Sequence, residues 1–306
     1  MLTAQEVRPI PFKAYSSSHY AMPLPTGHKF PMQKYAGVRF LVEQQRILVL
    51  EPPRADWDLV ERVHDQSYLK KLRFGTLSGK EIRLLGFPWS EMLIERALRA
   101  TGGTLAAAAD ALQTGLGINL AGGTHHAYPS HGEGFCVLND VAIACLELLA
   151  RGLERILVLD LDVHQGNGTA SIFKHEARVF TLSVHGERNY PFHKETSSLD
   201  IGLPDGVDDQ AYLQLLEERV LPVLTQFKPQ LVFYLAGVDV LARDQFGRFA
   251  LTLAGVQQRD TRVFAFCLAM GFPVVSLMAG GYNKDLGLTI QAHANTVLAA
   301  FEIFGG

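Results

Sequence analysis

The sequence predicts an α/β fold, a single domain with a central, mostly parallel sheet flanked by helices on both faces. Short apolar runs alternate with helical patterns, and each run ends in glycine or polar residues. Runs that are apolar throughout are typical of parallel strands covered on both faces. The strand candidates are residues 117–123, 155–162, 178–186, 230–237 and 273–281, and the helical patterns are 90–113, 135–152 and 210–227. No repeat, low-complexity tract or linker divides the 306 residues, so we expect one domain over residues 1–306.

The first two elements in chain order lead to a pair of histidines. The helical pattern 90–113 contains a Gly-Gly pair at 102–103, which costs about 1 kcal/mol per glycine relative to alanine in a helix. We interpret this pair as a point of close backbone packing, with a boundary at this position as the alternative. The strand candidate 117–123, GINLAGG, is followed one residue later by His125 and His126. These histidines therefore lie beyond the carboxyl end of a predicted strand.

The next strand candidate, residues 155–162, ends in acidic residues. In the stretch VLDLDVHQGNG, Asp160, Asp162 and His164 occupy alternate positions. Successive side chains of a strand point to opposite faces, so these three would project from one face into one small volume. Because a buried charge is costly unless it is paired or binds a metal, the pattern predicts either a bound cation or a run that is not a buried strand.

The last three strand candidates also end in groups that could take part in chemistry. Run 178–186 contains Ser183 and His185, run 230–237 leads to Asp239, and run 273–281 leads to Tyr282. Ligands of open parallel sheets bind beyond the carboxyl ends of the strands. If the five strands are parallel neighbours, all of these groups lie along one edge of the sheet.

One uncharged stretch, residues 263–282, is long enough to be tested as a membrane span, which needs about 20 apolar residues. Gly271 and Pro273 divide the stretch. The pattern predicts a helix end followed by a buried strand, so we expect no association with a membrane.

Composition and charge narrow the class of protein. A formal net charge of −3, with 48% hydrophobic and 19% charged residues, describes an enzyme-like body without electrostatic bias toward nucleic acid or acidic lipid. Three scattered cysteines are too few for a disulfide framework or a thiolate zinc site, and their odd number fits a reducing compartment. The first residues lack the order of a secretory signal. We therefore expect a cytoplasmic protein without direct nucleic-acid contact.

Asp162, His164 and Asp239 form a candidate ligand set of two carboxylates and one imidazole. Such a set suits a borderline divalent ion such as zinc, with at least one coordination position left open. An ion held in this way can polarise a carbonyl oxygen and lower the pKa of water toward about 7, which supports hydrolysis at neutral pH. Asp160 would face the same cavity as a carboxylate that orients a histidine.

The adjacent His125 and His126 are candidates for the proton transfers of a hydrolysis, because water must lose a proton and the leaving amine must gain one. A histidine paired with Asp160 would favour its cationic form, while one facing Asn167 would remain closer to a neutral base. Tyr282 follows two glycines and could donate a hydrogen bond to the oxyanion of a tetrahedral intermediate.

These residues lie in stretches that resemble the zinc-dependent histone deacetylase family in order and spacing over most of the chain. The stretches are GGTHHAYPSHGEGFCVLND (122–140), VLDLDVHQGNGTASIF (158–173), TLSVHG (181–186), AGVDVLARDQFGRFALT (236–252) and AGGY (279–282). The segment YSSSHYAMPLPTGHKFPMQKY (15–35) further resembles the class IV branch and its bacterial relatives. The resemblance implies a single α/β domain of the arginase–deacetylase type.

The same resemblance implies roles for individual residues. It implies zinc on Asp162, His164 and Asp239, the proton-handling pair His125 and His126, the carbonyl-polarising Tyr282, and Asp160 as the partner of His125. It also implies a substrate tunnel walled by Gly134, Phe135 and Tyr190, and a structural potassium ion near Asp160 and Ser183.

Two positions depart from the pattern of the family. Asn167 stands where many class I members carry an aspartate partner for the second histidine. Lys29 is the nearest match to an arginine that those members place beneath the tunnel. We therefore expect the acid–base balance of the histidine pair, and the region through which acetate would leave, to differ from those members.

The resemblance implies a zinc-dependent amidohydrolase that removes an acetyl or other acyl group from the side-chain amine of lysine in a protein or peptide. An alternative is an amidohydrolase of acetylpolyamines or other small acylated amines, whose motifs are closely similar. A deacylase that removes longer acyl groups is a further alternative. From a different class comes a non-catalytic sensor that binds acyl-lysine or a metabolite. A binuclear manganese ureohydrolase is disfavoured, because GVDVLARD (237–244) lacks a second closely spaced aspartate. The oligomeric state is left unknown.

Overall fold

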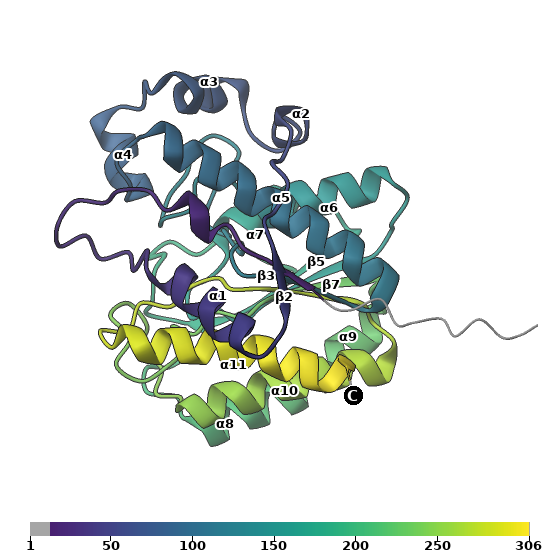
Figure 1. Cartoon of the computed structure of the whole chain (residues 1–306). Helices are drawn as coiled ribbons and strands as arrows, with labels where there is room; N and C mark the ends of the chain where they lie inside the picture. The colour runs from purple at the N-terminus through teal and green to yellow at the C-terminus, as the bar shows by residue number, and fades with distance from the viewer. Residues whose placement is uncertain (1–12, 306) are drawn as a thin grey trace, which may run out of the picture.

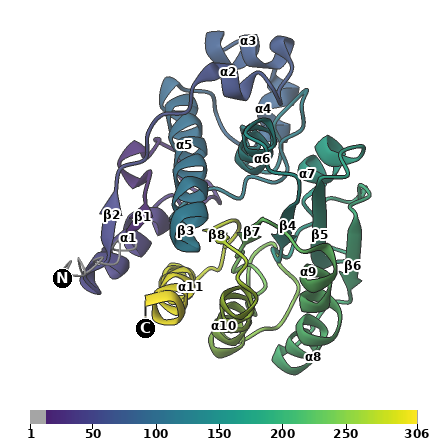
Figure 2. The ribbon, with the colours of Figure 1, turned by 90° about the vertical axis from the view of Figure 1, so that its right-hand side faces the viewer.

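The computed structural model describes residues 13–305, which build one eight-stranded sheet in the order β2-β1-β3-β8-β7-β4-β5-β6. Every pair of neighbouring strands is parallel, and Figure 2 shows the row of strands from β2 to β6. The strands are β1 (Lys13–Tyr15), β2 (Leu48–Leu50), β3 (Leu116–Asn119), β4 (Ile156–Asp160), β5 (Val179–Gly186), β6 (Leu199–Leu203), β7 (Leu231–Leu235) and β8 (Val274–Leu277).

Helices cover both faces of the sheet. α5, α6 and α7 lie on one face and α8 to α11 on the other (Figure 1, Figure 2), while α1 packs against α11. The α-helices are α1 (Lys34–Gln44), α2 (Trp57–Val60), α3 (Gln66–Phe74), α4 (Gly79–Leu85), α5 (Glu91–Thr114), α6 (Asp140–Ala150), α7 (Asn167–Phe173), α8 (Asp209–Leu215), α9 (Leu221–Phe227), α10 (Leu253–Met270) and α11 (Leu286–Gly305). A 3-10 turn, η1 (Ser18–Tyr20), and a π-helical turn, η2 (Leu216–Val220), complete the described elements.

The five strands expected from the sequence are the five adjacent strands β3, β8, β7, β4 and β5. Every residue of β4 and β7 is buried, which is why their sequences are apolar throughout. The strands that were not expected lie outside this block. β1 and β2 have three residues each and β6 is only partly buried, so neither length nor apolarity marks them. The predicted α/β fold with a parallel sheet is confirmed, while residues 1–12 and 306 of the expected domain lie outside the described residues.

The end of β4 corrects one expectation. The strand stops at Asp160, so Asp162 and His164 lie in the loop that follows and do not alternate along a strand. Backbone hydrogen bonds shape this loop: the amide nitrogens of Asp162 and His164 donate to the carboxylates of Asp160 and Asp162, at 3.2 and 3.0 Å. The three side chains converge because of this loop and not because of strand periodicity.

Two helical patterns also begin or continue differently from the expectation. Residues 135–139 of the pattern 135–152 form part of the preceding loop, and α6 begins at Asp140 because the Asn139 side chain accepts a hydrogen bond from the amide of Ala142 at 2.9 Å. Such side-chain caps set the first turn of a helix. The pattern 210–227 is divided by the π-helical turn η2 between α8 and α9.

The uncharged stretch 263–282 is divided as expected. α10 ends at Met270, where Gly271 adopts a left-handed conformation with φ of 67°, and β8 begins at Val274. No helix among residues 13–305 is both long enough and apolar enough to cross a membrane. The expected close packing at Gly102 is also present, since a Cβ atom there would overlap the carbonyl oxygen of Pro53.

Candidate active site

The carboxyl ends of β4 and β7, which are paired in the sheet, bring three candidate metal ligands together. Asp162 and His164 follow β4, and Asp239 follows β7. One ligand atom of each side chain lies within 4.8 Å of the others, and all three residues are buried. The structure therefore gathers two segments that are far apart in sequence into one potential coordination site.

Two features of this cluster fit a cation. Oδ2 of Asp239 is buried, makes no hydrogen bond with the described residues, and lies 3.2 Å from Nδ1 of His164. A Cβ atom on Gly280 would collide with carboxylate oxygens of both Asp162 and Asp239, so glycine keeps this space open. A buried carboxylate oxygen without a donor, facing an imidazole, is the environment in which a bound cation offsets the cost of burial.

In the absence of a cation, protons balance the charge of the cluster. Burial lowers the pKa of His164, but the hydrogen bond to Asp162 and the negative charges of Asp162 and Asp239 outweigh it and raise that pKa to about 10. Burial and the charge of Asp162 raise the pKa of Asp239 to about 7. Because metal ligands bind in their deprotonated forms, a divalent cation would replace these protons.

His125 and His126 have different partners. Nδ1 of His125 donates to Oδ2 of Asp160 at 2.7 Å, and Nδ1 of His126 donates to Oδ1 of Asn167 at 2.7 Å. Burial lowers the pKa of His125, but nearby carboxylates, first of all Asp160, raise it to about 9. Burial and the positive charge of His125 hold the pKa of His126 well below its usual value. These surroundings favour the cationic form of His125 and the neutral form of His126.

Glu133, which the sequence did not single out, fixes the orientation of Asn167. Nδ2 of Asn167 donates to Oε1 of Glu133 at 2.7 Å, and the hydroxyl of Tyr190 donates to the same oxygen at 2.8 Å. A carboxylate only accepts hydrogen bonds, so the amide must turn its oxygen toward His126. Nδ1 of His126 therefore carries the proton, and Nε2 is left to accept one.

Asp244, the last residue of the GVDVLARD stretch, holds the backbone beside Tyr282. The amide nitrogen of Tyr282 donates to Oδ2 of Asp244 at 2.7 Å, and Oδ1 accepts from the amides of Phe246 and Gly247. Burial, followed by the charges of the two aspartates of the cluster, raises the pKa of Tyr282 well above its usual value. The Tyr282 hydroxyl therefore keeps its proton and can act as a hydrogen-bond donor.

Aromatic side chains wall the approach to the cluster. The rings of Phe135 and Phe246, of which the sequence singled out only the first, lie 6.3 Å apart. Tyr190 packs edge-on against His126, with 5.1 Å between the ring centroids. A Cβ atom on Gly134 would lie 2.6 Å from the His126 ring. The three predicted tunnel residues, Gly134, Phe135 and Tyr190, thus lie around one opening.

Lys29 does not lie beneath the site as expected, whereas Lys34 is a buried cation there. Lys29 is exposed, and its ammonium lies 5.8 Å from the centroid of the Phe246 ring. Lys34, the first residue of α1, is fully buried. Its Nζ donates to the carbonyl oxygens of Ala279 and Gly281 at 3.4 and 3.3 Å. The loop before α1 therefore sends Lys29 outward and Lys34 inward, which sequence spacing alone does not reveal.

The two residues expected near a potassium ion, Asp160 and Ser183, are register partners on β4 and β5. Both are buried, and Oγ of Ser183 lies 3.0 Å from Nδ1 of His185. The structure thus places them side by side, and the potassium ion itself stays a prediction.

The comparisons with known proteins decide the family. Residues 29–298 match the model of the histone deacetylase domain. The chain belongs to the histone deacetylase family. It is 44% identical over 290 residues to an uncharacterized protein of Picosynechococcus sp., with 93% of this chain and 97% of that protein covered. It is also 31% identical over 288 residues to histone deacetylase 2 of Arabidopsis thaliana, with 89% of this chain and 74% of that protein covered.

The fold of this histone deacetylase family member is also that of solved structures. A crystal structure of a histone deacetylase (HDAC) homolog complexed with SAHA superposes with a TM-score of 0.81 at 24% identity, covering 97% of this chain and 84% of the other. The family predicted from the motifs is confirmed by the domain match and the relatives above, the solved structure confirms the fold, and the class IV branch stays a prediction.

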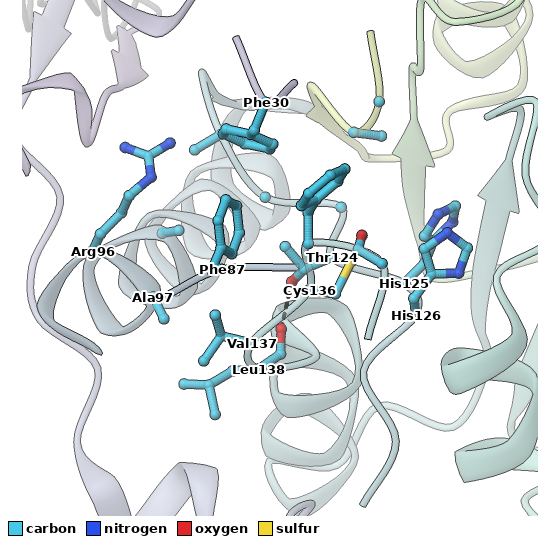
Figure 3. Close-up of a pocket in the computed structure, with 18 of the residues that line it drawn as sticks. Phe30, Phe87, Arg96, Ala97, Thr124, His125, His126, Cys136, Val137 and Leu138 are labelled. Carbon is cyan, nitrogen blue, oxygen red and sulfur yellow. Dashed lines mark hydrogen bonds between the residues drawn. The ribbon is translucent and has the colours of Figure 1, made fainter. Parts of the chain in front are cut away.

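The histone deacetylase domain also contains a cavity of about 80 Å³ that adjoins the active site. His125 and His126 lie at one end, and Arg96 and Ala97 of α5 lie at the other (Figure 3). The Arg96 guanidinium stacks over the ring of Tyr35 at 4.0 Å from its centroid. The space that leads away from the histidines is thus small, and side chains of α5 line its far end.

Three residues of the site gave different signals in the sequence. Glu133 stands between two glycines in the GEGF stretch, and Asp244 follows Asp239 by five positions. Both acids could have been proposed from their place in the motifs. Lys34 carries no such signal, because its burial depends on the path of the loop before α1.

Proposed function

We propose that this chain is a zinc-dependent hydrolase that removes an acetyl group from the side-chain amine of lysine in a protein or peptide. The observation that carries the proposal is the meeting of Asp162, His164 and Asp239 in one open, buried cluster. Membership of the histone deacetylase family supports it. The cytoplasmic location, the class IV branch and a structural potassium ion belong to the same proposal.

In the proposed reaction a zinc ion and the Tyr282 side chain both act on the acyl carbonyl group. Zinc, held by Asp162, His164 and Asp239, would supply Lewis acidity toward the acyl carbonyl and toward water. The Tyr282 hydroxyl, which keeps its proton, donates to the oxygen that becomes negative in the tetrahedral intermediate.

The histidine pair moves the protons. Nε2 of His126 accepts the proton of the attacking water, since its Nδ1 is already committed to Asn167. As the C–N bond breaks, protonated Nε2 of His126 gives this proton to the amine nitrogen, while His125, whose cationic form Asp160 favours, offsets the negative charge of the tetrahedral intermediate. Phe135 and Tyr190 enclose the linear alkyl stem that joins this amine to the rest of the substrate.

Turnover by the zinc-loaded protein tests the proposal. An acetyl-lysine peptide and an acetylated polyamine are offered separately, and release of acetate is measured together with zinc content. We expect acetate release from the peptide at one zinc ion per chain. Binding of both compounds without turnover would point instead to an acyl-lysine or metabolite sensor.

Acyl length provides a further prediction. A cavity of about 80 Å³ is smaller than the roughly 150 Å³ that accepts a benzene ring. An octanoyl group would have to displace packed side chains, which costs about 1–3 kcal/mol. We expect kcat/KM for acetyl-lysine to exceed that for octanoyl-lysine by roughly 10- to 100-fold, measured on peptides that are otherwise identical.

Enlarging the cavity tests the reason for this preference. Leu93 of α5 is buried and lines the cavity, and Leu93→Ala removes three carbons from its wall. The ratio of acetyl to octanoyl turnover is expected to fall in this variant. A wild-type protein that hydrolyses octanoyl-lysine as fast as acetyl-lysine would contradict the size argument.

Removing Glu133 should lower kcat with little effect on KM. In Glu133→Ala the Asn167 amide can rotate and present its NH₂ group to His126, which disturbs the proton acceptor. We expect kcat to fall roughly 10- to 100-fold, the usual cost of losing a partner that orients a functional histidine. Steady-state kinetics on the acetyl-lysine peptide measures both constants.

Two variants separate this positioning role from general damage to the fold. Glu133→Gln still offers an oxygen to Asn167 and is expected to restore most of kcat. Tyr190→Phe removes the other hydrogen bond to Glu133 but leaves the one from Asn167, so it should affect KM more than kcat. Equal losses in Glu133→Ala and Glu133→Gln would argue against the role.

A further inference from the structure

The mouth of the site is a hollow of about 540 Å³. It reaches inward to His126, His164 and Tyr282. Its outer wall includes Arg83, Leu84, Arg188, Phe192, Phe246 and Arg248. Any group attached to the amine of the substrate must therefore pass between these outer side chains.

The outer wall is positively charged, although the whole chain carries a net charge of −3. Three arginines line the hollow, and none of its described lining residues is an aspartate or a glutamate. Arg248 is paired with Asp205 at 3.3 Å. Arg83 and Arg188 are exposed and have no ion-pair partner within residues 13–305. Two guanidinium groups at the mouth are thus available to a ligand.

A neighbouring hollow adds positive charge on another side of the mouth. It adjoins the first at Gln245 and is lined by Lys29, Arg243 and Lys284. Asp244 is the carboxylate among its described lining residues. Its oxygens accept hydrogen bonds from three backbone amides, and within residues 13–305 it forms no ion pair with these three cations.

A positively charged mouth favours ligands that carry negative charge over ligands that carry positive charge. Exposed charges act over about 10 Å at 0.1 M salt, and clustered charge raises the local concentration of ligands of the opposite sign. A guanidinium binds a carboxylate through two parallel hydrogen bonds. A polyamine or a lysine-rich peptide would instead bring further positive charge to this wall.

We infer, resting on the proposed function, that the preferred substrate is an acylated amine with a carboxylate beyond the far end of its alkyl stem, where the stem leaves the mouth. Arg83 and Arg188 bind this carboxylate at the mouth. The chemistry is shared by an acetyl-lysine flanked by aspartate or glutamate in a peptide and by free acetyl-lysine with its α-carboxylate.

Two matched substrate sets test the inference and distinguish the sources of the carboxylate. The first set holds three peptides with a central acetyl-lysine flanked by aspartate, serine or lysine. The second holds free acetyl-lysine and its methyl ester. We expect kcat/KM for the aspartate peptide to exceed that for the lysine peptide by roughly tenfold or more at low ionic strength, with the difference shrinking as salt is added.

Charge reversal at the mouth assigns the effect to particular residues. In the double variant Arg83→Glu, Arg188→Glu, the lysine peptide should become the better substrate. Lys174→Glu is the control, because Lys174 is exposed at the far end of α7 and its reversal changes the net charge without changing the mouth. In Lys174→Glu the three peptides should keep the order of kcat/KM that they have with the unaltered protein.

The outcomes separate this inference from the proposed function. Fluorescence polarisation of the labelled peptides reports the same charge order even when none of them is turned over, so a failure of hydrolysis leaves the charge preference measurable. A preference for the aspartate peptide would support the inference and identify a flanking acidic residue as the source of the carboxylate. A preference for free acetyl-lysine over its methyl ester would support it and identify the α-carboxylate. Equal kcat/KM values for all members of each set would overturn the inference. An unchanged order of the three peptides in the double variant would also overturn it.

Discussion

Replacing Asp162 by alanine is expected to abolish zinc uptake and turnover together. Asp162 is buried, with Oδ1 at 3.0 Å from Nδ1 of His164, and Oδ2 accepts a hydrogen bond from the Gly280 amide at 2.7 Å. The variant would leave one carboxylate and one imidazole for the cation. Loss of a direct ligand should lower the metal affinity by more than the roughly 10- to 100-fold that follows loss of a residue that only orients a ligand.

Metal content and thermal unfolding measure this result without relying on activity. A cation that binds only the folded protein raises its stability in proportion to RT ln(1 + [L]/Kd). The rise in Tm on adding zinc should therefore be present in the unaltered protein and absent in Asp162→Ala.

Asp160→Asn is the matched variant for the metal site. It alters the carboxylate that holds His125 and leaves the three proposed ligands in place. We expect it to lower turnover and to retain zinc. A full complement of zinc in Asp162→Ala would contradict the assignment of the metal site.

The elements that the sequence predicts best are the strands that are buried on both faces, because burial requires their residues to be apolar. β4 and β7 are buried along their whole length, so their apolar sequences predicted both the strands and the parallel sheet. The polar residues that follow them were expected at one edge for the same topological reason. β6, which is partly exposed, had no such signature.

The path of the loops could not be predicted in the same way. The sequence suggested that Asp162 and His164 alternate along a strand, whereas backbone hydrogen bonds to carboxylates fold the segment into a loop. The burial of Lys34 likewise depends on carbonyl oxygens more than two hundred residues away in sequence, at Ala279 and Gly281. Local patterns predict elements, while such long-range contacts decide which side chains enter the site.

Replacing His126 by alanine is expected to lower kcat by roughly 10²- to 10⁴-fold, the usual contribution of a positioned general base. His126 is buried, and its Nδ1 is held by Asn167 at 2.7 Å. Because His126 is not among the proposed ligands, zinc binding should stay near that of the unaltered protein. His175→Ala, at an exposed position, is the control and should leave kcat unchanged. Turnover within tenfold of normal in His126→Ala would show that another group accepts the proton.

The partner of His126 should set the pH at which this base works. The double variant Glu133→Gln, Asn167→Asp keeps a hydrogen bond between positions 133 and 167, because the glutamine NH₂ can donate to the new carboxylate. That carboxylate favours the cationic form of His126, so the pKa of His126 rises. Since the base must be neutral to accept a proton, the acid limb of the kcat profile should move to higher pH, by about one pH unit or more. Glu133→Gln alone adds no charge beside His126 and should leave the acid limb in place, so an identical limb in both variants would mean that His126 does not control it.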